Sequence, residues 1–266
     1  MSDDAVLLDV ENGVATMTLN KPEVRNALTA ELSHAIIDTI DDLETRDDVR
    51  CLVVTGQEGT FCAGGDINSM VERMSGDMPL HDAVRNIQQV TSRAVRRVYE
   101  FHRPTVAKVD GAAFGAGGNL AIACDCLVAS ERARIGFGFR QVGLAVDSGT
   151  SYLLPRIVGE NVAKELVFTG ELLDAERASE LGIFNHVYED FDAEAEEFVA
   201  SIAEGPSVAL ETSKRLIEQG LSSDLKQAQD DEAAAQAAVF ATHDHEEGAT
   251  AFMESRSPEF EGSSAV

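Results

Sequence analysis

A glycine-rich loop that opens a helix is the part of this sequence best suited to chemistry. It lies in residues 110–125, after an apolar run, Thr105–Val109, that predicts a strand. Backbone N–H groups in the first turn of a helix have no intrahelical partner, and glycines let a ligand approach them. Such a helix end can hold a negative oxygen, either of a phosphate or of an oxyanion formed during a reaction. A dinucleotide fingerprint would need glycine in place of Leu120, and a tight turn without a ligand is the other alternative.

A second glycine loop, residues 61–67, follows a short apolar run, Cys51–Gly56, that predicts a buried strand. Its glycines again permit close approach to the backbone, and Asp66 can cap a helix that follows. Both loops therefore offer backbone donors to an anion.

The elements that must position these loops follow an α/β pattern. Apolar alternation around a turn at residues 11–13 predicts a β-hairpin, and apolar residues at helical spacing predict helices from residue 29 and over residues 82–101. Further strands are predicted at residues 127–129, 134–139 and 183–188, and further helices at 159–168, 175–181 and from 191 onward, with breaks near 205–206 and 220. We expect a layered α/β body with a helical C-terminal region.

The composition is strongly acidic. Among 266 residues, 47 Asp and Glu face 21 Lys and Arg, which gives a formal charge of -26. Repulsion on this scale destabilises a compact chain in dilute buffer, whereas about 1 M salt shortens the Debye length to about 3 Å and screens it. We therefore expect a high-salt cytosol. The acids alternate with apolar residues, which argues against a disordered acidic chain.

The composition also excludes several partners. Nucleic acid is not expected, because phosphate binding needs clustered basic residues. The sequence shows no apolar run of roughly 18 residues and no signal-peptide pattern at its start, so we expect a cytoplasmic protein without a membrane partner. The cysteines lack metal-binding spacing, so buried free thiols and no metal are expected; they are Cys51, Cys62, Cys124 and Cys126.

Four segments together resemble the enoyl-CoA hydratase/isomerase (crotonase) family, in order and at the family's spacing. They are residues 19–28, 61–67, 111–125 and 143–156, and the resemblance continues to residues 256–260. It implies a crotonase-like α/β spiral of ββα repeats with a C-terminal helical region, a homotrimer or dimer of trimers, and acyl-CoA substrates. We therefore expect a core with the acyl-CoA site in residues 1–204 and a helical oligomerisation region in residues 205–266. Coenzyme A is part of the substrate, so no separate cofactor is expected.

The resemblance also implies site residues. The family holds the thioester oxygen between two backbone N–H groups while an enolate forms, and by position these belong to Gly65 and Ala116. The family's contacts with the substrate and its CoA correspond to Val24, Arg25, Ala63, Gly64, Asp66, Ile67, Asn119 and Phe139.

The chain departs from the family's hydratases at both of their acidic positions, where it has Asn119 and Phe139. Neither side chain transfers a proton at neutral pH. A carboxylate remains at Asp147, where some isomerases of the family carry their base and where a dehalogenase of the family carries its nucleophile. The alternative for Asp147 is a helix N-cap ahead of residues 148–154.

The predicted activity is isomerisation of an enoyl-CoA double bond, of an aliphatic or a ring-type substrate, with Asp147 as the single base. An enoyl-CoA hydratase of fatty-acid β-oxidation is the alternative, and would need a carboxylate elsewhere. A non-catalytic acyl-CoA-binding paralogue would keep both donor loops and lose both acids. A serine protease of similar fold is disfavoured, because the chain has no Gly-x-Ser-x-Gly motif.

Overall fold

A six-stranded sheet forms one layer of the structure. The computed structural model describes residues 4–66, 71 and 79–262. The order of strands in the sheet is β1-β2-β3-β4-β6-β9. The strands are β1 (Val6–Glu11), β2 (Val14–Leu19), β3 (Cys51–Gly56), β4 (Thr105–Val109), β6 (Cys126–Ser130) and β9 (His186–Tyr188). The predicted hairpin is present as the antiparallel pair β1 and β2, and every later pair in this sheet is parallel.

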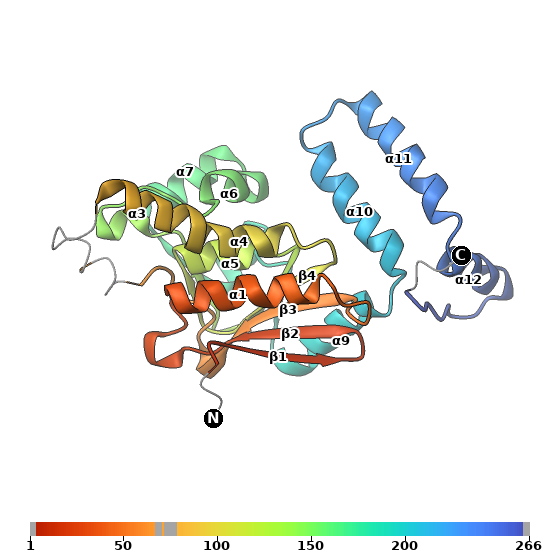
Figure 1. Cartoon of the computed structure of the whole chain (residues 1–266), viewed down its shortest axis with the longest axis horizontal. Coiled ribbons are helices and arrows are strands. Elements are labelled where there is room, and N and C mark those ends of the chain that lie inside the picture. Colours follow the sequence, from red (N-terminus) through yellow and green to blue (C-terminus); the bar gives the residue numbers. More distant parts are fainter. Residues whose placement is uncertain (1–3, 67–70, 72–78, 263–266) are drawn as a thin grey trace.

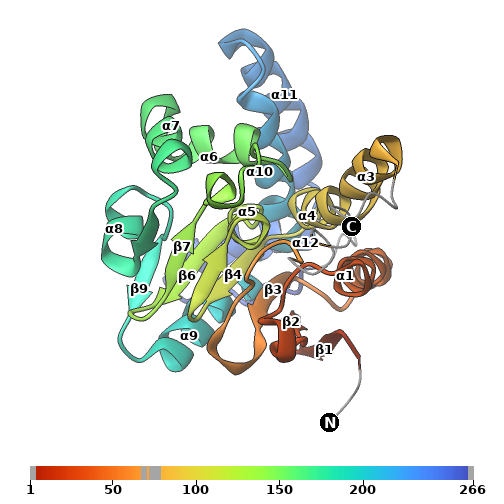
Figure 2. The ribbon, with the colours of Figure 1, turned by 90° about the vertical axis from the view of Figure 1, so that its left-hand side faces the viewer.

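The central strand β3 is buried on both faces, as expected of a parallel strand with helices on either side. Leu52 and Val54 face a core shared with helix α1 (Ala30–Leu43), whereas Cys51 and Val53 face helix α9 (Phe191–Ala203). Figure 2 shows α1 and α9 on opposite sides of the sheet.

A smaller, three-stranded sheet has the order β5-β7-β8, formed by β5 (Ala112–Phe114), β7 (Arg134–Gly136) and β8 (Leu172–Asp174). The chain enters each sheet in turn: β4 and β5 precede helix α5 (Ala116–Ile122), and β6 and β7 follow it. The predicted repeat of strand, strand and helix is thus present.

Helical segments differ from the predictions in two places. The long helix expected at residues 82–101 is present as one unbroken helical run. It differs from the expectation in containing a π-helical turn, η3 (Ile87–Thr91), between α3 (Leu80–Asn86) and α4 (Ser92–Tyr99). The predicted strand at residues 134–139 ends at Gly136, and a 3-10 helix, η4 (Phe139–Val142), follows. The Phe114 ring packs against Gly138, where an added Cβ would lie 2.1 Å from Phe114 Cζ.

The remaining elements of the body are short. They are the 3-10 helices η1 (Pro22–Val24) and η2 (Gln57–Gly59) and the α-helices α6 (Thr150–Val158), α7 (Glu160–Thr169) and α8 (Ala175–Glu180). Thr29 caps α1 by accepting a hydrogen bond from Leu32 N, which explains why that helix begins where the sequence predicts.

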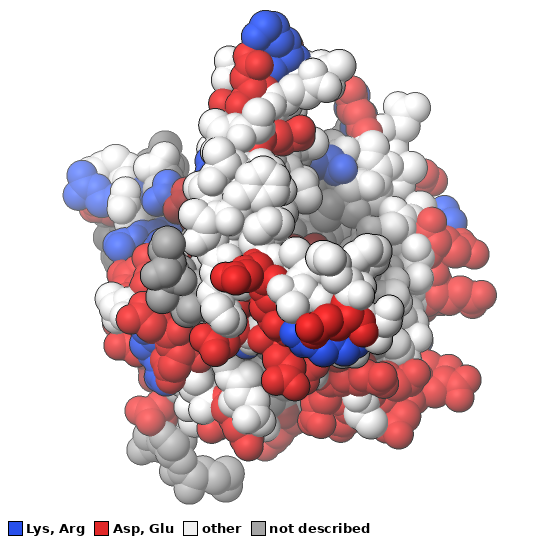
Figure 3. Space-filling view, turned by 90° about the vertical axis from the view of Figure 1, so that its right-hand side faces the viewer, with Lys and Arg blue, Asp and Glu red and all other residues white. Residues whose placement is uncertain are grey.

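The C-terminal region is helical, with α10 (Ser207–Gly220), α11 (Leu225–Val239) and α12 (His243–Glu254). Helices α10 and α11 form an antiparallel pair that projects from the body (Figure 1), and α11 buries none of its own side chains. Acidic side chains dominate the lower part of the face at this end of the molecule (Figure 3). Within the residues described, no helix combines the length and the apolar character that a bilayer span requires.

Arg50 ties this region to the sheet. Its guanidinium donates hydrogen bonds to Gly205 O at 2.6 Å, Ser207 Oγ at 3.0 Å and Phe260 O at 3.3 Å. A second tie is the ion pair between Lys214 Nζ of α10 and Asp125 Oδ2, which are 2.8 Å apart.

Candidate active site

The two glycine loops lie against each other. Cys62 N donates to Ala112 O at 3.0 Å, and Phe114 N donates to Cys62 O at 2.9 Å, so the second loop runs beside β5. An added Cβ on Gly64 would lie 2.4 Å from Phe114 O and 3.4 Å from Ala116 N. Only glycine permits this approach at Gly64, whose φ of 94° also disfavours other residues.

The backbone fixes the directions of the Gly65 and Ala116 N–H groups, the two donors that the resemblance implies. Gly65 forms a parallel bridge with Leu28, in which Leu28 N donates to Gly64 O at 2.7 Å. In such a bridge the N–H of Gly65 itself points away from Leu28. Ala116 is the first residue of α5, so its N–H has no intrahelical partner.

The segment before α1 joins the same loops. Ala63 N donates to Arg25 O at 3.0 Å, which places Val24 and Arg25 beside the second loop. The fully buried Asn26 amide donates to Gln57 O at 3.2 Å and Thr60 O at 2.8 Å. Asp66 is half-buried at the end of the loop, and Ile67 lies outside the described residues.

Asp147 lies between η4 and α6 with its carboxyl group turned inward. Its Oδ1 atom is buried and has no hydrogen-bond partner among the described residues. Burial raises the pKa of Asp147, and a hydrogen bond with the Ser148 side chain partly opposes this effect. The N-cap alternative is wrong, because α6 begins after Gly149 and no side chain caps it.

Asn119 and Thr150 bind the backbone of the same turn. Asn119 Nδ2 donates to Asp147 O at 2.9 Å, and Thr150 Oγ1 donates to Asn119 Oδ1 at 2.8 Å. Asn119 is 0% exposed and Thr150 1% exposed. The contacts that the structure gives Asn119 are therefore with this turn, and its expected contact with a substrate stays a prediction.

Phe139, an expected substrate contact, is buried beside a second phenylalanine, Phe137. Phe137 is fully buried and Phe139 nearly so, whereas Leu144 is exposed. Leu144 N donates to Phe139 O at 3.1 Å, so Leu144 folds back against the first residue of η4.

Two further contacts of this region escape sequence reasoning. Ser148 Oγ lies 3.4 Å from Ser92 Oγ of α4, and the Asn26 amide fastens residues 57–60. Local sequence patterns do not predict either contact, because the partners are distant in the sequence. The only available signal was that the residues are polar. Among the residues described, no group of His, Cys, Asp and Glu has an arrangement suited to a metal ion.

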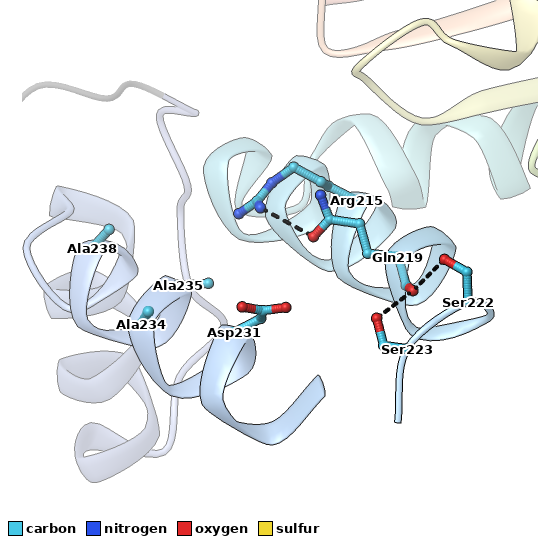
Figure 4. A pocket seen from close by; sticks show the side chains of 8 residues that line it. All are labelled: Arg215, Gln219, Ser222, Ser223, Asp231, Ala234, Ala235 and Ala238. Atoms are coloured by element: carbon cyan, nitrogen blue, oxygen red, sulfur yellow. Dashed lines mark hydrogen bonds between the residues drawn. The ribbon is translucent and has the colours of Figure 1, made fainter. Parts of the chain in front are cut away.

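A hollow of about 650 Å³ lies elsewhere, between α10 and α11 (Figure 4). Arg215 and Gln219 of α10 line one side of it, and Asp231 lies with Ala234, Ala235 and Ala238 on α11 at the other side. None of its lining residues belongs to the glycine loops or to the Asp147 turn. We place the candidate site at the loops, because the first turn of α5 leaves backbone N–H groups without intrahelical partners and a buried carboxylate oxygen lies in the same part of the fold.

Comparison with known proteins identifies the family. The sequence profile described as enoyl-CoA hydratase/isomerase matches residues 9–263, so the chain belongs to that family of enzymes. This confirms the resemblance seen in the four segments.

A 1,2-epoxyphenylacetyl-CoA isomerase of Escherichia coli K12 is 33% identical over 97% of this chain and 98% of its own. A short-chain-enoyl-CoA hydratase of Clostridium acetobutylicum is 32% identical over 94% of this chain and 95% of its own.

The fold is confirmed in the same way. The crystal structure of an enoyl-CoA hydratase/isomerase from Cupriavidus metallidurans CH34 matches with a TM-score of 0.89 at 34% identity, over 98% of each chain. The relatives include both an isomerase and a hydratase, so membership leaves the reaction open between these two.

Proposed function

We propose that this enzyme isomerises the double bond of an enoyl-CoA with Asp147 as its single base. The observation that carries the proposal is the Oδ1 atom of Asp147, which is buried and has no hydrogen-bond partner among the residues that the structure describes. The positions at which the family's hydratases carry two acids hold Asn119 and Phe139 instead. One carboxylate suffices for isomerisation, because the same group can take a proton from one carbon and return it to another.

The proposed reaction begins with the thioester oxygen between the N–H groups of Gly65 and Ala116. Asp147 takes a proton from a carbon of the acyl chain, and the electron pair of the broken C–H bond delocalises onto the thioester oxygen. The protonated Asp147 then returns the proton to a different carbon, and the double bond has moved. Burial supports this role, since a raised pKa brings the carboxyl group closer to working pH.

The substrate is proposed to be an acyl-CoA whose adenine end lies along the second loop. Val24, Arg25, Ala63, Gly64, Asp66 and Ile67 are the proposed contacts there. Phe139 is proposed to line the acyl side, and the isomerase from E. coli, which is named for an aryl substrate, supports a ring-type acyl group.

The test is a panel of 2-enoyl-, 3-enoyl- and aryl-CoA substrates assayed in molar salt with wild type and Asp147→Asn. We expect Asp147→Asn to lower conversion of 3-enoyl-CoA to 2-enoyl-CoA by roughly 10²- to 10⁴-fold while CoA binding is retained. Asp9→Asn, on the exposed face of β1, is the matched control and should behave as wild type. Robust hydration of crotonyl-CoA by Asp147→Asn would refute the proposal.

Hydration of an enoyl-CoA is the second candidate. The hydratase from C. acetobutylicum supports it. It requires a carboxylate to activate water, and the two positions where the family's hydratases carry that pair are occupied by Asn119 and Phe139.

We also propose a homotrimer or dimer of trimers, working in a high-salt cytosol, with residues 205–266 as the oligomerisation region. Large apolar side chains of this region are exposed, which supports an interface there. They are Ile217, Leu221, Leu225, Phe240, Phe252 and Met253.

A further inference from the structure

The turn that carries Asp147 has an unfavourable backbone. Ser148 has a φ of 47°, which is uncommon for a residue with a side chain, and Gly149 follows with a φ of 96°. Such conformations persist only where the surrounding structure holds them in place.

The side chain of Asn119, in helix α5, binds this turn through hydrogen bonds. Its Nδ2 donates to Asp147 O at 2.9 Å and its Oδ1 accepts from Thr150 Oγ1 at 2.8 Å. Thr150 Oγ1 also lies 3.1 Å from Asp147 O, and Thr150 N donates to that same oxygen at 3.1 Å. The three residues thus form a closed set of hydrogen bonds, which we call the turn clamp.

The two side chains of the turn clamp are shielded from water, and their hydrogen bonds require one arrangement of donors and acceptors. Both side chains are essentially inaccessible to water, so each hydrogen bond would leave a buried polar group unsatisfied if it were broken. The orientation of the Asn119 amide follows from its partners. Asp147 O is a carbonyl oxygen and can only accept, so Nδ2 faces it and Oδ1 is left to accept from the Thr150 hydroxyl. A carboxylate at Asn119 could not donate to Asp147 O.

The turn clamp includes Asn119 of helix α5, and the same helix begins at Ala116, the proposed oxyanion donor. Ala116 and Asn119 share the first turn of α5, and that helix is fully buried. The hold on Asp147 and the Ala116 N–H therefore belong to one rigid element.

We infer that Asn119 and Thr150 are positioning residues, which fix the Asp147 carboxyl group relative to the N-terminus of α5. The inference rests on the proposed function of Asp147. Proton transfer is sensitive to such placement, and an error of about 1 Å can lower a rate about 10²-fold.

The experiment compares Thr150→Val, which keeps the shape and loses the hydroxyl, with Thr150→Ser, which keeps the hydroxyl. We expect Thr150→Val to lower kcat by about 10- to 100-fold with KM changed by less than about twofold. The acidic limb of its kcat–pH profile should move to lower pH, because a loosened carboxyl group gains water and loses part of its raised pKa. Thr150→Ser should restore kcat and the pH profile.

Thr105→Val is the matched control. Thr105 is also a fully buried threonine, and its hydroxyl is bonded to Asp125 Oδ2 at 2.9 Å, away from the Asp147 turn. We expect it to lower Tm while kcat and the acidic limb stay as in wild type. Thr150→Ala serves by the same criteria if Thr150→Val does not fold.

Asp147→Asn in the same assay separates the positioning role of Asn119 and Thr150 from the proposed function of Asp147. If it abolishes turnover while Thr150→Val keeps the wild-type kcat and pH profile, the positioning role is overturned and the proposed function stands. If Asp147→Asn turns over as wild type does, the proposed function fails and the positioning role with it.

Discussion

Asp147 has a carboxyl group in surroundings where its charged form is unfavourable. Its Oδ1 is buried and no described residue gives it a hydrogen bond, and burial raises the pKa of Asp147. The folded chain therefore binds this proton more tightly than the unfolded chain, where the pKa of Asp is about 3.9. The resulting contribution to stability is complete below that value and is lost as pH rises through the folded pKa.

We predict that Asp147→Asn is more stable than wild type at neutral pH, because the substitution removes a buried charge. The difference in free energy of unfolding should grow as pH rises above the pKa of unfolded Asp, about 3.9, and the wild-type group ionises in the folded chain. Chemical denaturation at several pH values measures it, with Asp9→Asn as the exposed control. A difference that does not change with pH would contradict the prediction.

At the scale of elements, the Arg50 contacts hold three chain segments together. They join the start of β3 to the connection between α9 and α10 and to the last described residues. Arg50 is half-buried, so its bonds are less exposed to water than those of a surface ion pair.

We predict that Arg50→Met lowers the free energy of unfolding by about 1.5–3 kcal/mol, since hydrogen bonds of a charged group are lost. Arg46→Met is the control, because Arg46 pairs with Asp48 at 2.6 Å on the surface, and such pairs are worth about 0–1 kcal/mol. Urea denaturation distinguishes the two. Equal losses in both variants would show that the Arg50 contacts are not special.

Local sequence signals predicted β3 and α1 correctly, because an apolar run between turn residues and a capping threonine are both local. The π-helical turn Ile87–Thr91 was missed, since apolar spacing does not distinguish it from an α-helix. The end of β7 was missed because Gly138 packs against Phe114, a contact between distant residues. In the candidate site the glycine loops were predictable from the sequence. The hydrogen bond from Thr150 to Asn119 was not, because it joins residues 31 apart and no local pattern indicates it.

At the scale of the molecule, charge is the dominant property. The formal charge is -26, and acidic side chains dominate the lower part of the face in Figure 3. We predict that Tm rises between about 0.1 M and about 2 M KCl, because salt screens the repulsion between these groups. Calorimetry or circular dichroism melts test this. An unchanged Tm would contradict the prediction.

Exposed apolar side chains on α12 predict that copies of the chain assemble. Phe252 and Met253 are 87% and 85% exposed on α12, and we expect a neighbouring copy to cover them. Light scattering in high salt should give three or six times the 28.5 kDa of one chain. Phe252→Asp should lower this mass, whereas Phe168→Asp on α7, outside residues 205–266, should not. A monomeric wild type would refute the expectation.

The Arg50 contacts also impose an order on events during synthesis. Arg50 leaves the ribosome early, but its acceptors lie 155, 157 and 210 residues later in the chain. Strands β1–β4 can pair while translation continues, because domains form from the N-terminus as the chain emerges. The guanidinium has none of these partners until residues 205–207 have been added, and it lacks the third until Phe260 has been added. Closure of these contacts therefore follows the synthesis of the whole sheet, and a chain truncated before Phe260 would lack one of its three acceptors.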